Sequence, residues 1–358
     1  MSGRVSLAGD KRPLLVTGGA GFIGCNLANR LAEEGENVLI YDSLARPGVE
    51  DNLAWLRSRH PRRIAAVIAD IRDTQALGDA VRESAGVFHL AAQVAVTASM
   101  ENPEEDLQVN LLGTFGLLEA LRRWPQPCVF ASTNKVYGHL EGMELMRAGD
   151  AYVPADPALR RYGWNETGGL DFRTPYGCSK GAADQYVLDY AASFGLPTAV
   201  MRMSCIYGPH QKGTEDQGWV AHFLLRALAG QAITIYGDGH QVRDVLYVDD
   251  AVRAYLAAWR NIGQVQGRAF NLGGGPGNAV SLLQLIRHVG TMLGREVPLR
   301  FADWRPNDQR YYVSDTRLVE TTLSLPKPLD WRSGVAELLR HFAELQGDLT
   351  RPAEAASA

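Results

Sequence analysis

The sequence predicts an α/β protein with a doubly wound parallel sheet and a smaller C-terminal α/β lobe. Three observations support this prediction. Short apolar segments alternate with helix-length segments over about the first 205 residues, a glycine-rich turn follows the first apolar segment, and the alternation weakens afterwards. Strands and helices that alternate in this way form parallel sheets with helices on both faces. A chain of 358 residues is long enough for two such parts.

The expected elements follow from hydrophobic periodicity and length. Buried strands are expected at 13–17, 37–41, 64–68, 86–90, 127–132 and 198–203. Helices are expected between them, most clearly at 22–34, 74–83 and 106–123. In the second lobe the pattern predicts helices at 219–229, 248–259 and 280–293.

These elements predict the organisation of the chain. The first domain is expected at 13–204, with a strand and a helix returning to it near 240–275, and the second lobe at 205–240 and 276–345. The polar or small-residue segments 1–12 and 347–358 are expected to be flexible tails. The long, weakly periodic stretch 138–174 is expected to be a functional loop, because long irregular loops in compact proteins usually serve a function.

Charge and hydropathy exclude several classes of partner. The chain has 36 Lys and Arg against 40 Asp and Glu, so it lacks the basic surplus that drives nucleic-acid binding. Its longest uncharged stretch, 269–286, contains four Gly and a Pro, and no apolar signal segment opens the chain. We therefore expect no nucleic acid, no membrane span and a cytoplasmic location.

The cysteines and histidines predict no metal site. Four cysteines stand far apart and without a C-x-x-C motif, which is typical of buried thiols in a reducing compartment: Cys25, Cys128, Cys178 and Cys205. His89 and His222 have no partners at metal-ligand spacing, so both are expected to be structural.

A glycine-rich turn joins the first expected strand to the first expected helix. The segment is Thr17-Gly18-Gly19-Ala20-Gly21-Phe22-Ile23-Gly24. Such a turn needs glycine for the tight bend, for backbone approach to a pyrophosphate and for helix–strand packing. The N-terminus of the helix then faces the phosphates. We therefore predict a dinucleotide site at Gly18, Gly21, Phe22, Ile23 and Gly24.

An acidic residue after the second expected strand indicates which dinucleotide binds. Asp42 follows Gly24 at a separation of 18 residues, close to the spacing at which an acid bonds the ribose hydroxyls. Its negative charge would repel a 2′-phosphate, so NAD is predicted over NADP. Arg46 lies four residues later and is the nearby positive charge that bears on this choice. Asp70 and Ile71, after the third expected strand, are predicted to contact the adenine.

A tyrosine, a lysine and a threonine are predicted to be catalytic. Tyr176 and Lys180 lie one helical turn apart and would share a helix face. An ammonium beside a phenol favours the phenolate, and base chemistry near neutral pH needs this because the ordinary pKa of tyrosine is about 10. Thr133, at the end of another expected strand, supplies a hydroxyl.

These motifs together resemble the extended short-chain dehydrogenase/reductase superfamily of nucleotide-sugar enzymes, over about residues 14–335. The resemblance rests on the glycine-rich turn, His89-Leu90-Ala91-Ala92-Gln93, Tyr176-Gly177-Cys178-Ser179-Lys180, Arg243-Asp244-Val245-Leu246-Tyr247-Val248-Asp249-Asp250 and Asn271-Leu272-Gly273-Gly274-Gly275. It implies tightly bound NAD, a catalytic Thr/Tyr/Lys set and a nucleoside-diphosphate sugar between the lobes. It also implies NAD contacts from Ala91, Gln93, Tyr176 and Lys180.

The two residues after Thr133 narrow the expected reaction. In the 4,6-dehydratases of this superfamily an Asp–Glu pair stands where Asn134 and Lys135 stand here. Water elimination needs a proton donor and a base, whereas an amide has no titratable proton and an ammonium has the wrong charge. Decarboxylating members also carry Glu at the position of Lys135, so neither reaction is expected.

Longer segments resemble the CDP-paratose 2-epimerase branch of the superfamily. These segments are 132–138, 170–172, 175–186, 216–220 and 239–246. The loop 138–174 departs from that branch in detail. Cys205 stands where many superfamily members have an Asn that bonds the substrate phosphates. The resemblance therefore leaves the nucleobase and the sugar open.

The resemblance also implies which residues hold the substrate. Arg243 and Arg305 match positions that clamp the diphosphate, a role that suits a planar guanidinium group. The other residues expected to border the substrate are Asn134, Lys135, Gln217, Trp219, Val220 and Tyr236.

The sequence thus predicts an NAD-dependent epimerase that inverts C2 of a nucleoside-diphosphate sugar, of the CDP-paratose or CDP-glucose type, through a 2-keto intermediate. The alternatives are a C4 epimerase with the same catalytic set and a non-catalytic NAD-binding regulator. An intact Thr133, Tyr176 and Lys180 favour an enzyme. The resemblance also suggests a homodimer or a dimer of dimers, formed through helices near 106–123 and 179–193.

Overall fold

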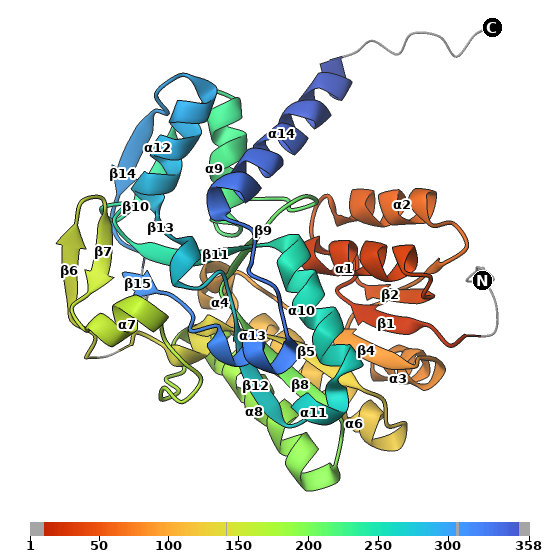
Figure 1. The fold of residues 1–358 in the computed structure, drawn as a ribbon. Coiled ribbons are helices and arrows are strands. Elements are labelled where there is room, and N and C mark those ends of the chain that lie inside the picture. Colours follow the sequence, from red (N-terminus) through yellow and green to blue (C-terminus); the bar gives the residue numbers. More distant parts are fainter. Residues whose placement is uncertain (1–10, 141, 306–307, 351–358) are drawn as a thin grey trace, which may run out of the picture.

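The computed structural model describes residues 11–140, 142–305 and 308–350 (Figure 1). Its main sheet consists of β1 (Leu14–Thr17), β2 (Val38–Asp42), β3 (Ile64–Ile68), β4 (Gly86–His89), β5 (Cys128–Thr133), β8 (Thr198–Met203) and β12 (Arg268–Leu272). The strands are parallel and follow the order β12-β8-β5-β4-β1-β2-β3. The predicted doubly wound α/β fold is confirmed, and each of the six expected strands lies within one residue of its expected limits.

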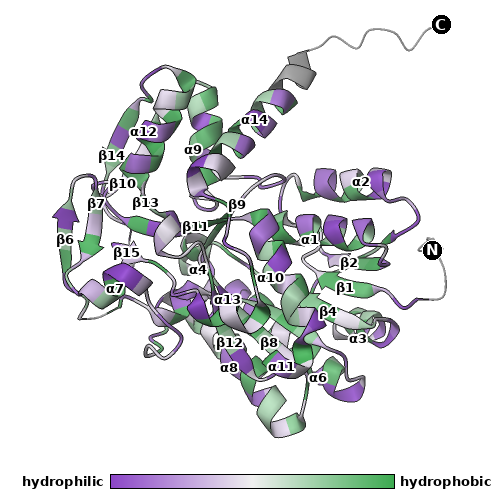
Figure 2. Ribbon diagram, in the orientation of Figure 1, coloured by the Kyte–Doolittle hydropathy of each residue, from purple (hydrophilic) through white to green (hydrophobic). Residues whose placement is uncertain are grey.

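Helices cover both faces of this sheet. One face carries α1 (Phe22–Glu33), α2 (Val49–Arg59) and α10 (Val248–Arg260), and the other carries α3 (Thr74–Glu83), α6 (Gly113–Arg123) and α8 (Thr174–Phe194). Two hydrophobic cores result, one on each side of the strands. The strands are accordingly hydrophobic along most of their length (Figure 2), as expected for a sheet that is buried on both faces.

The helix expected at 106–123 is interrupted. The chain forms α4 (Val96–Glu101), α5 (Pro103–Leu107), a π-helical turn η1 (Gln108–Leu112) and only then α6. A π turn inserts an extra residue without breaking the helical run, so hydrophobic periodicity does not reveal it. The turn directs Asn110, which is buried, toward α8.

The second lobe lies at the upper left of Figure 1. Its longer helices are α9 (Trp219–Leu228), α12 (Leu282–Leu293) and α14 (Trp331–Thr350), and its strands are β9 (Cys205–Tyr207), β10 (Ile233–Tyr236), β11 (Val242–Tyr247), β13 (Ala279–Ser281), β14 (Leu299–Ala302) and β15 (Tyr311–Tyr312). Short helices complete the fold at η2 (Asn134–Tyr137), α11 (Ile262–Val265), η3 (Pro276–Asn278) and α13 (Arg317–Leu323). A third hydrophobic core fills this lobe.

Three expectations for local structure were wrong. The helix expected from residue 280 begins at Leu282, because Ser281 and Gln284 form a capping box and residues 279–281 pair with β11. The stretch 138–174 contains the hairpin β6 (Leu145–Ala148) and β7 (Ala151–Pro154) and the helix α7 (Pro157–Tyr162). The tail expected from residue 347 is helical as far as Thr350, and residues 1–10 and 351–358 lie outside the described residues.

Among the described helices, none combines the length and the apolar character that a membrane span requires. All four cysteines are free thiols. The expectation that all are buried was wrong: Cys178 is exposed on α8, and Cys205 is half-buried.

Candidate active site

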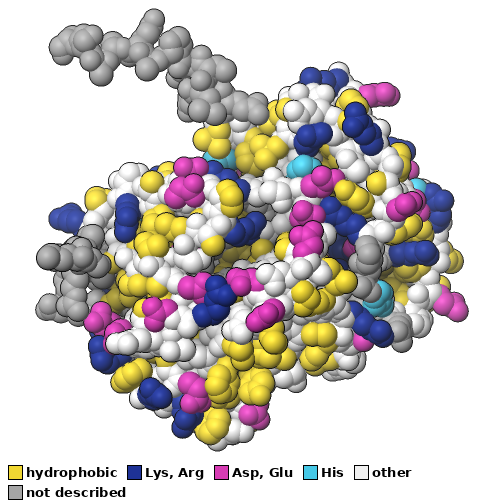
Figure 3. All heavy atoms as spheres, turned by 180° about the vertical axis from the view of Figure 1, so that it is seen from behind, with side chains coloured by type: hydrophobic (Ala, Val, Ile, Leu, Met, Phe, Trp, Pro, Cys, Tyr) yellow, Lys and Arg dark blue, Asp and Glu magenta, His cyan; other side chains and the backbone are white. Residues whose placement is uncertain are grey.

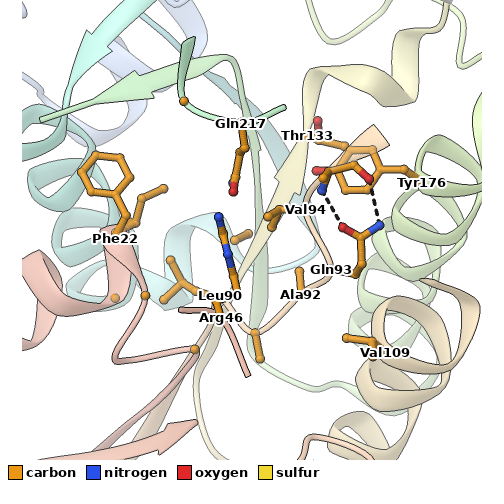
Figure 4. Close-up of a pocket in the computed structure, with 18 of the residues that line it drawn as sticks. Phe22, Arg46, Leu90, Ala92, Gln93, Val94, Val109, Thr133, Tyr176 and Gln217 are labelled. Atoms are coloured by element: carbon orange, nitrogen blue, oxygen red, sulfur yellow. Dashed lines mark hydrogen bonds between the residues drawn. The ribbon is translucent and has the colours of Figure 1, made fainter. Parts of the chain in front are cut away.

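A cavity of about 780 Å³ opens at the carboxyl ends of the central strands (Figure 4). The strand order reverses between β1 and β4, and ligands of doubly wound sheets bind at such switch points. The wall on one side contains the glycine-rich turn and Asp42, and the wall on the other contains Thr133, Tyr176 and residues of the loop 211–220. The residues predicted for the cofactor and those predicted for the chemistry therefore share one cavity.

The glycine-rich turn brings backbone close to backbone. A Cβ on Gly18, whose φ is +67°, would lie 2.7 Å from the amide nitrogen of Ala91, and a Cβ on Gly24 would lie 2.2 Å from the carbonyl oxygen of Gly18. Gly21 is the N-cap of α1, so the first amides of the helix border the cavity without a capping side chain. These amides and the helix dipole suit a pyrophosphate.

Asp42 is held at the cavity wall by two backbone amides. Its Oδ2 accepts a hydrogen bond from the amide of Ala20 at 3.0 Å, and its Oδ1 accepts one from the amide of Leu44 at 2.9 Å. Arg46 points into the cavity beside it (Figure 4), and burial lowers the pKa of this guanidinium. A carboxylate fixed at this place suits the ribose hydroxyls of NAD.

The predicted adenine residues lie at the rim of the same cavity. Asp70 and Ile71 both belong to its wall. Asp70 forms an ion pair with Arg72 at 2.7 Å, and this interaction lowers the pKa of its carboxyl group. The adenine contact of Asp70 stays a prediction, since its carboxylate already has a partner.

Tyr176 and Lys180 lie in the first two turns of α8, and Thr133 ends β5. Lys180 is 3% exposed, donates a hydrogen bond to the carbonyl oxygen of Ala131 at 2.6 Å and lies 4.2 Å from the ring of Phe130. Burial lowers its pKa to about 7. Burial raises the pKa of Tyr176 to about 12. The hydrogen bond with Thr133, and not the expected ammonium of Lys180, is the interaction that lowers this pKa here.

The sequence analysis did not identify a buried carboxylate, Asp106, that is hydrogen-bonded to residues around this site. Asp106 is fully buried and accepts hydrogen bonds from Gln93 at 2.9 Å, from Asn110 at 3.1 Å and from Ser179. The backbone N–H of Gln93 also donates a hydrogen bond to Oδ1 of Asn110 at 2.9 Å. Gln93 is therefore fixed at the cavity wall (Figure 4), while Asp106 ties η1 to the catalytic helix. These contacts depend on the π turn, so no sequence pattern predicted them.

His89 is structural in its contacts. It is buried, its Nδ1 bonds the hydroxyl of Thr17 at 2.7 Å, and its Nε2 bonds that of Thr114 at 3.0 Å. Burial lowers its pKa to about 3. Both ring nitrogens are thus used within the protein. His222, on α9, has a pKa that burial also lowers.

Five of the eight predicted substrate residues line the cavity. They are Asn134, Lys135, Gln217, Trp219 and Val220. The indole nitrogen of Trp219 lies 3.4 Å from the sulfur of Cys205, which belongs to the same wall.

Lys135 adds a half-buried positive charge at this end of the cavity. Burial and the neighbouring Arg243 together lower its pKa to about 8, against an opposing effect of Asp308.

The other three predicted substrate residues are not among the residues that line the cavity. Arg243 is committed to Asp308 at 2.8 Å. Arg305 stacks on Tyr236, with 4.1 Å to the ring centroid, and donates a hydrogen bond to the carbonyl oxygen of Glu215. Arg305 and Tyr236 thus hold the loop that covers the cavity, and none of the three is at the wall itself. Direct contact with a diphosphate would require these side chains to exchange partners.

Comparisons with known proteins place this site in context. Residues 14–273 match the model of the NAD dependent epimerase/dehydratase family. A CDP-paratose 2-epimerase of Salmonella typhi is 39% identical over 91% of this chain and 97% of its own. A UDP-glucose 4-epimerase of Thermotoga maritima, solved with UDP-glucose, superposes with a TM-score of 0.80 at 28% identity, covering 93% of this chain and 99% of the other.

A UDP-glucose 4-epimerase of Thermus thermophilus, solved with NAD, has a TM-score of 0.77 at 30% identity and covers 92% and 99% of the two chains. Together these matches confirm the predicted superfamily and the predicted cofactor, NAD.

Proposed function

Since the chain belongs to the NAD dependent epimerase/dehydratase family, we propose that it inverts C2 of a nucleoside-diphosphate sugar through a 2-keto intermediate. The observation that carries the proposal is the polar set beside Thr133. Asn134 and Lys135 line the cavity where water elimination would need an acid and a base. The similarity to a CDP-paratose 2-epimerase supports C2 as the carbon and a CDP-sugar as the substrate class.

The residues of the chain divide the work between the two ends of the cavity. The first amides of α1 and the turn at Gly18 would hold the pyrophosphate of NAD, and Asp42 would hold its ribose. NAD, when bound, supplies a hydride acceptor that can return the hydride, so that no external reductant is consumed.

At the chemical end, Tyr176 takes the proton from the sugar hydroxyl and later returns it. Thr133 bonds the reacting oxygen and also contacts the phenol. Lys180 keeps its ammonium directed at Ala131 and Phe130, which fixes its position beneath the cofactor site. After oxidation the sugar must present its other face, and the contacts to the nucleotide diphosphate hold it during that rotation.

A C4 epimerase is the second candidate, because a UDP-glucose 4-epimerase superposes over 93% of this chain. Both reactions use the same Thr133, Tyr176 and Lys180. The sugar's orientation in the cavity decides between them, and the wall that would set this orientation includes Lys135 and Cys205.

The test is epimerisation of CDP-, GDP- and UDP-hexoses that carry deuterium at C2, in ordinary water, followed by NMR at C2 and C4. The proposal expects inversion at C2 with the deuterium retained there, because the hydride leaves and returns to the same carbon. Inversion at C4 would replace it with the second candidate. Loss of deuterium to water would instead indicate proton abstraction without NAD chemistry.

We also propose that two copies of the chain associate through α6 and α8. Large hydrophobic side chains are exposed on these helices and on the turns that lead into α6: Leu107, Leu112, Phe115, Tyr186 and Phe194. Figure 3 shows hydrophobic side chains gathered on the lower part of one face of the molecule. Patches of this kind are typical of protein interfaces. Sedimentation should give a dimer, and Phe115→Glu should give a monomer.

A further inference from the structure

A buried glutamine of the second lobe contacts the turn that follows Thr133, residues 134–138, which we call the catalytic turn. Gln309 is 3% exposed, and its Nε2 donates a hydrogen bond to the carbonyl oxygen of Gly138, the residue that follows η2. Its Oε1 accepts a hydrogen bond from Nδ2 of Asn134 at 3.4 Å. Asn134 itself is 8% exposed, and its Oδ1 lies 3.5 Å from the hydroxyl oxygen of Thr133. Gln309 thus begins a chain of polar contacts that ends at a catalytic residue.

The direction of every bond in this chain follows from its first member. A backbone carbonyl oxygen can only accept a hydrogen bond, so the amide nitrogen of Gln309 must face Gly138. Its oxygen then faces Asn134, whose nitrogen must face Gln309. The carbonyl oxygen of Asn134 is therefore the atom presented to Thr133, and it can only accept the hydroxyl proton.

Thr133 needs such an acceptor because its partner Tyr176 changes protonation state. A hydroxyl group has one proton to donate and lone pairs that accept. While Tyr176 is a phenolate, Thr133 stabilises it by donating that proton. Once Tyr176 is protonated, its phenol can donate to a lone pair of Thr133, and Thr133 no longer needs to donate to it. When no sugar oxygen is present to accept it, the proton of Thr133 needs another acceptor, and Oδ1 of Asn134 lies 3.5 Å away.

We propose that Gln309 is a positioning residue, which fixes the amide of Asn134 so that Thr133 can reverse its hydrogen bond when Tyr176 is protonated and deprotonated. The inference rests on the proposed function, in which one turnover protonates and deprotonates Tyr176 once each. The contacts at 3.4 and 3.5 Å are long, as catalytic hydrogen bonds often are before substrate binds.

Gln241 provides a matched control within the same lobe. It is also 3% exposed, and its Nε2 donates a hydrogen bond to a carbonyl oxygen, that of Tyr236. Substitution of either glutamine by Leu removes a buried amide and should cost similar stability. Only Gln309 contacts the catalytic turn, so only its variants should change the proton chemistry.

The activity experiment compares Gln309→Leu, Gln309→Glu and the same two changes at Gln241, with CDP-glucose as substrate and rates normalised to NAD-loaded, folded protein. Gln309→Leu should lower kcat by about tenfold or more and change KM by less than about twofold. In Gln309→Glu, the protonated carboxyl group could donate to Gly138 and accept from Asn134, as the glutamine amide does. Gln309→Glu should therefore regain kcat relative to wild type as the pH falls, and Gln309→Leu should not.

A second measurement needs no substrate. In protein labelled at tyrosine Cζ with ¹³C, the Tyr176 signal, assigned with Tyr176→Phe, should shift in Gln309→Leu and stay in place in Gln241→Leu. If wild type turns over no nucleotide sugar while this shift is seen, the proposed function fails and the positioning role stands. An unchanged Tyr176 signal in Gln309→Leu, or equal effects in the Gln241 variants, would overturn the inference.

Discussion

The buried ion pair of Asp184 and Arg202 contacts β5, the strand that ends in the catalytic Thr133. The side chains are 0% and 5% exposed, respectively. Two nitrogens of Arg202 donate to Asp184 at 3.0 and 2.9 Å, and the hydroxyl of Ser132 donates to the same carboxylate at 2.7 Å. Arg202 also donates to the phenol of Tyr137 at 3.1 Å. The pair thus joins α8 to β8 and to the strand that ends in Thr133.

Arg202→Met should be strongly destabilising because it leaves the carboxylate of Asp184 buried and without its cation. Removing one partner of a buried pair costs about 3–5 kcal/mol. Ser132 and Gln185 still donate to Asp184, so the lower part of this range is expected. Asp184→Leu combined with Arg202→Met replaces both charges by apolar side chains, which is often neutral or stabilising. Because each single change should cost about 3 kcal/mol and the double change close to zero, the coupling energy of the double-mutant cycle should exceed about 3 kcal/mol in magnitude.

Urea unfolding at pH 7 with saturating NAD measures each free energy of unfolding. Arg260→Met is the control, since its pair with Glu34 is half-exposed and such pairs contribute roughly 0–1 kcal/mol. A cost below about 1 kcal/mol for Arg202→Met, or a double variant as unstable as the sum of the single changes, would refute the reasoning.

Three further predictions concern the active site. Tyr176→Phe should lower kcat by about 10²- to 10⁴-fold with little change in nucleotide-sugar binding by calorimetry; weakened binding with turnover intact would assign Tyr176 to substrate positioning instead. Gly24→Ala should reduce the NAD that copurifies with the protein, measured in the supernatant after denaturation, because its Cβ would lie 2.2 Å from the carbonyl oxygen of Gly18. The pKa of Lys180 is lowered to about 7. Above pH 7 the unfolded chain therefore keeps a proton on Lys180 that the folded chain has lost. The free energy of unfolding of wild type should rise by up to about 1.4 kcal/mol per pH unit from pH 7 to 9, relative to Lys180→Met. Urea midpoints that change equally with pH in the two proteins would contradict this.

The main sheet could be predicted because its signals are local. Strands such as β3 are continuous apolar runs. Residues 14–24 combine a strand, spaced glycines and the start of a helix within eleven residues. Tyr176 and Lys180 needed only helical spacing to be placed on one face. All of these features depend on neighbours in the chain, so they survive without knowledge of the tertiary structure.

Features that depend on distant partners could not be predicted. The π turn at 108–112 leaves the hydrophobic period almost unchanged, yet it brings Asn110 to Asp106 and Gln93.

The start of α12 was misplaced for a different reason. Ser281 and Gln284 have the spacing of a capping box, and this signal, readable in the sequence, marks the boundary that hydrophobic periodicity missed.

The interaction partners of two charged residues, Lys180 and Arg243, could not be predicted either. Sequence spacing places an ammonium near Tyr176, but the direction of that ammonium depends on β5, whose carbonyl oxygen at Ala131 accepts its hydrogen bond. Arg243 is likewise held by Asp308, a residue far away in the chain. A side chain's charge can be read from the sequence, whereas its partner is set by the fold.

The direction of the hydrogen bonds in the catalytic turn also depends on a residue far away in the chain. Asn134 could present either end of its amide to Thr133, and the two orientations differ in whether the hydroxyl finds a donor or an acceptor. Gln309 removes this ambiguity, because the carbonyl oxygen of Gly138 can only accept a hydrogen bond. The catalytic residues thus come from the first domain, while the polarity of their contacts is set by a side chain of the second lobe. A change in that lobe can therefore alter the proton chemistry of Tyr176 without altering any residue that touches it.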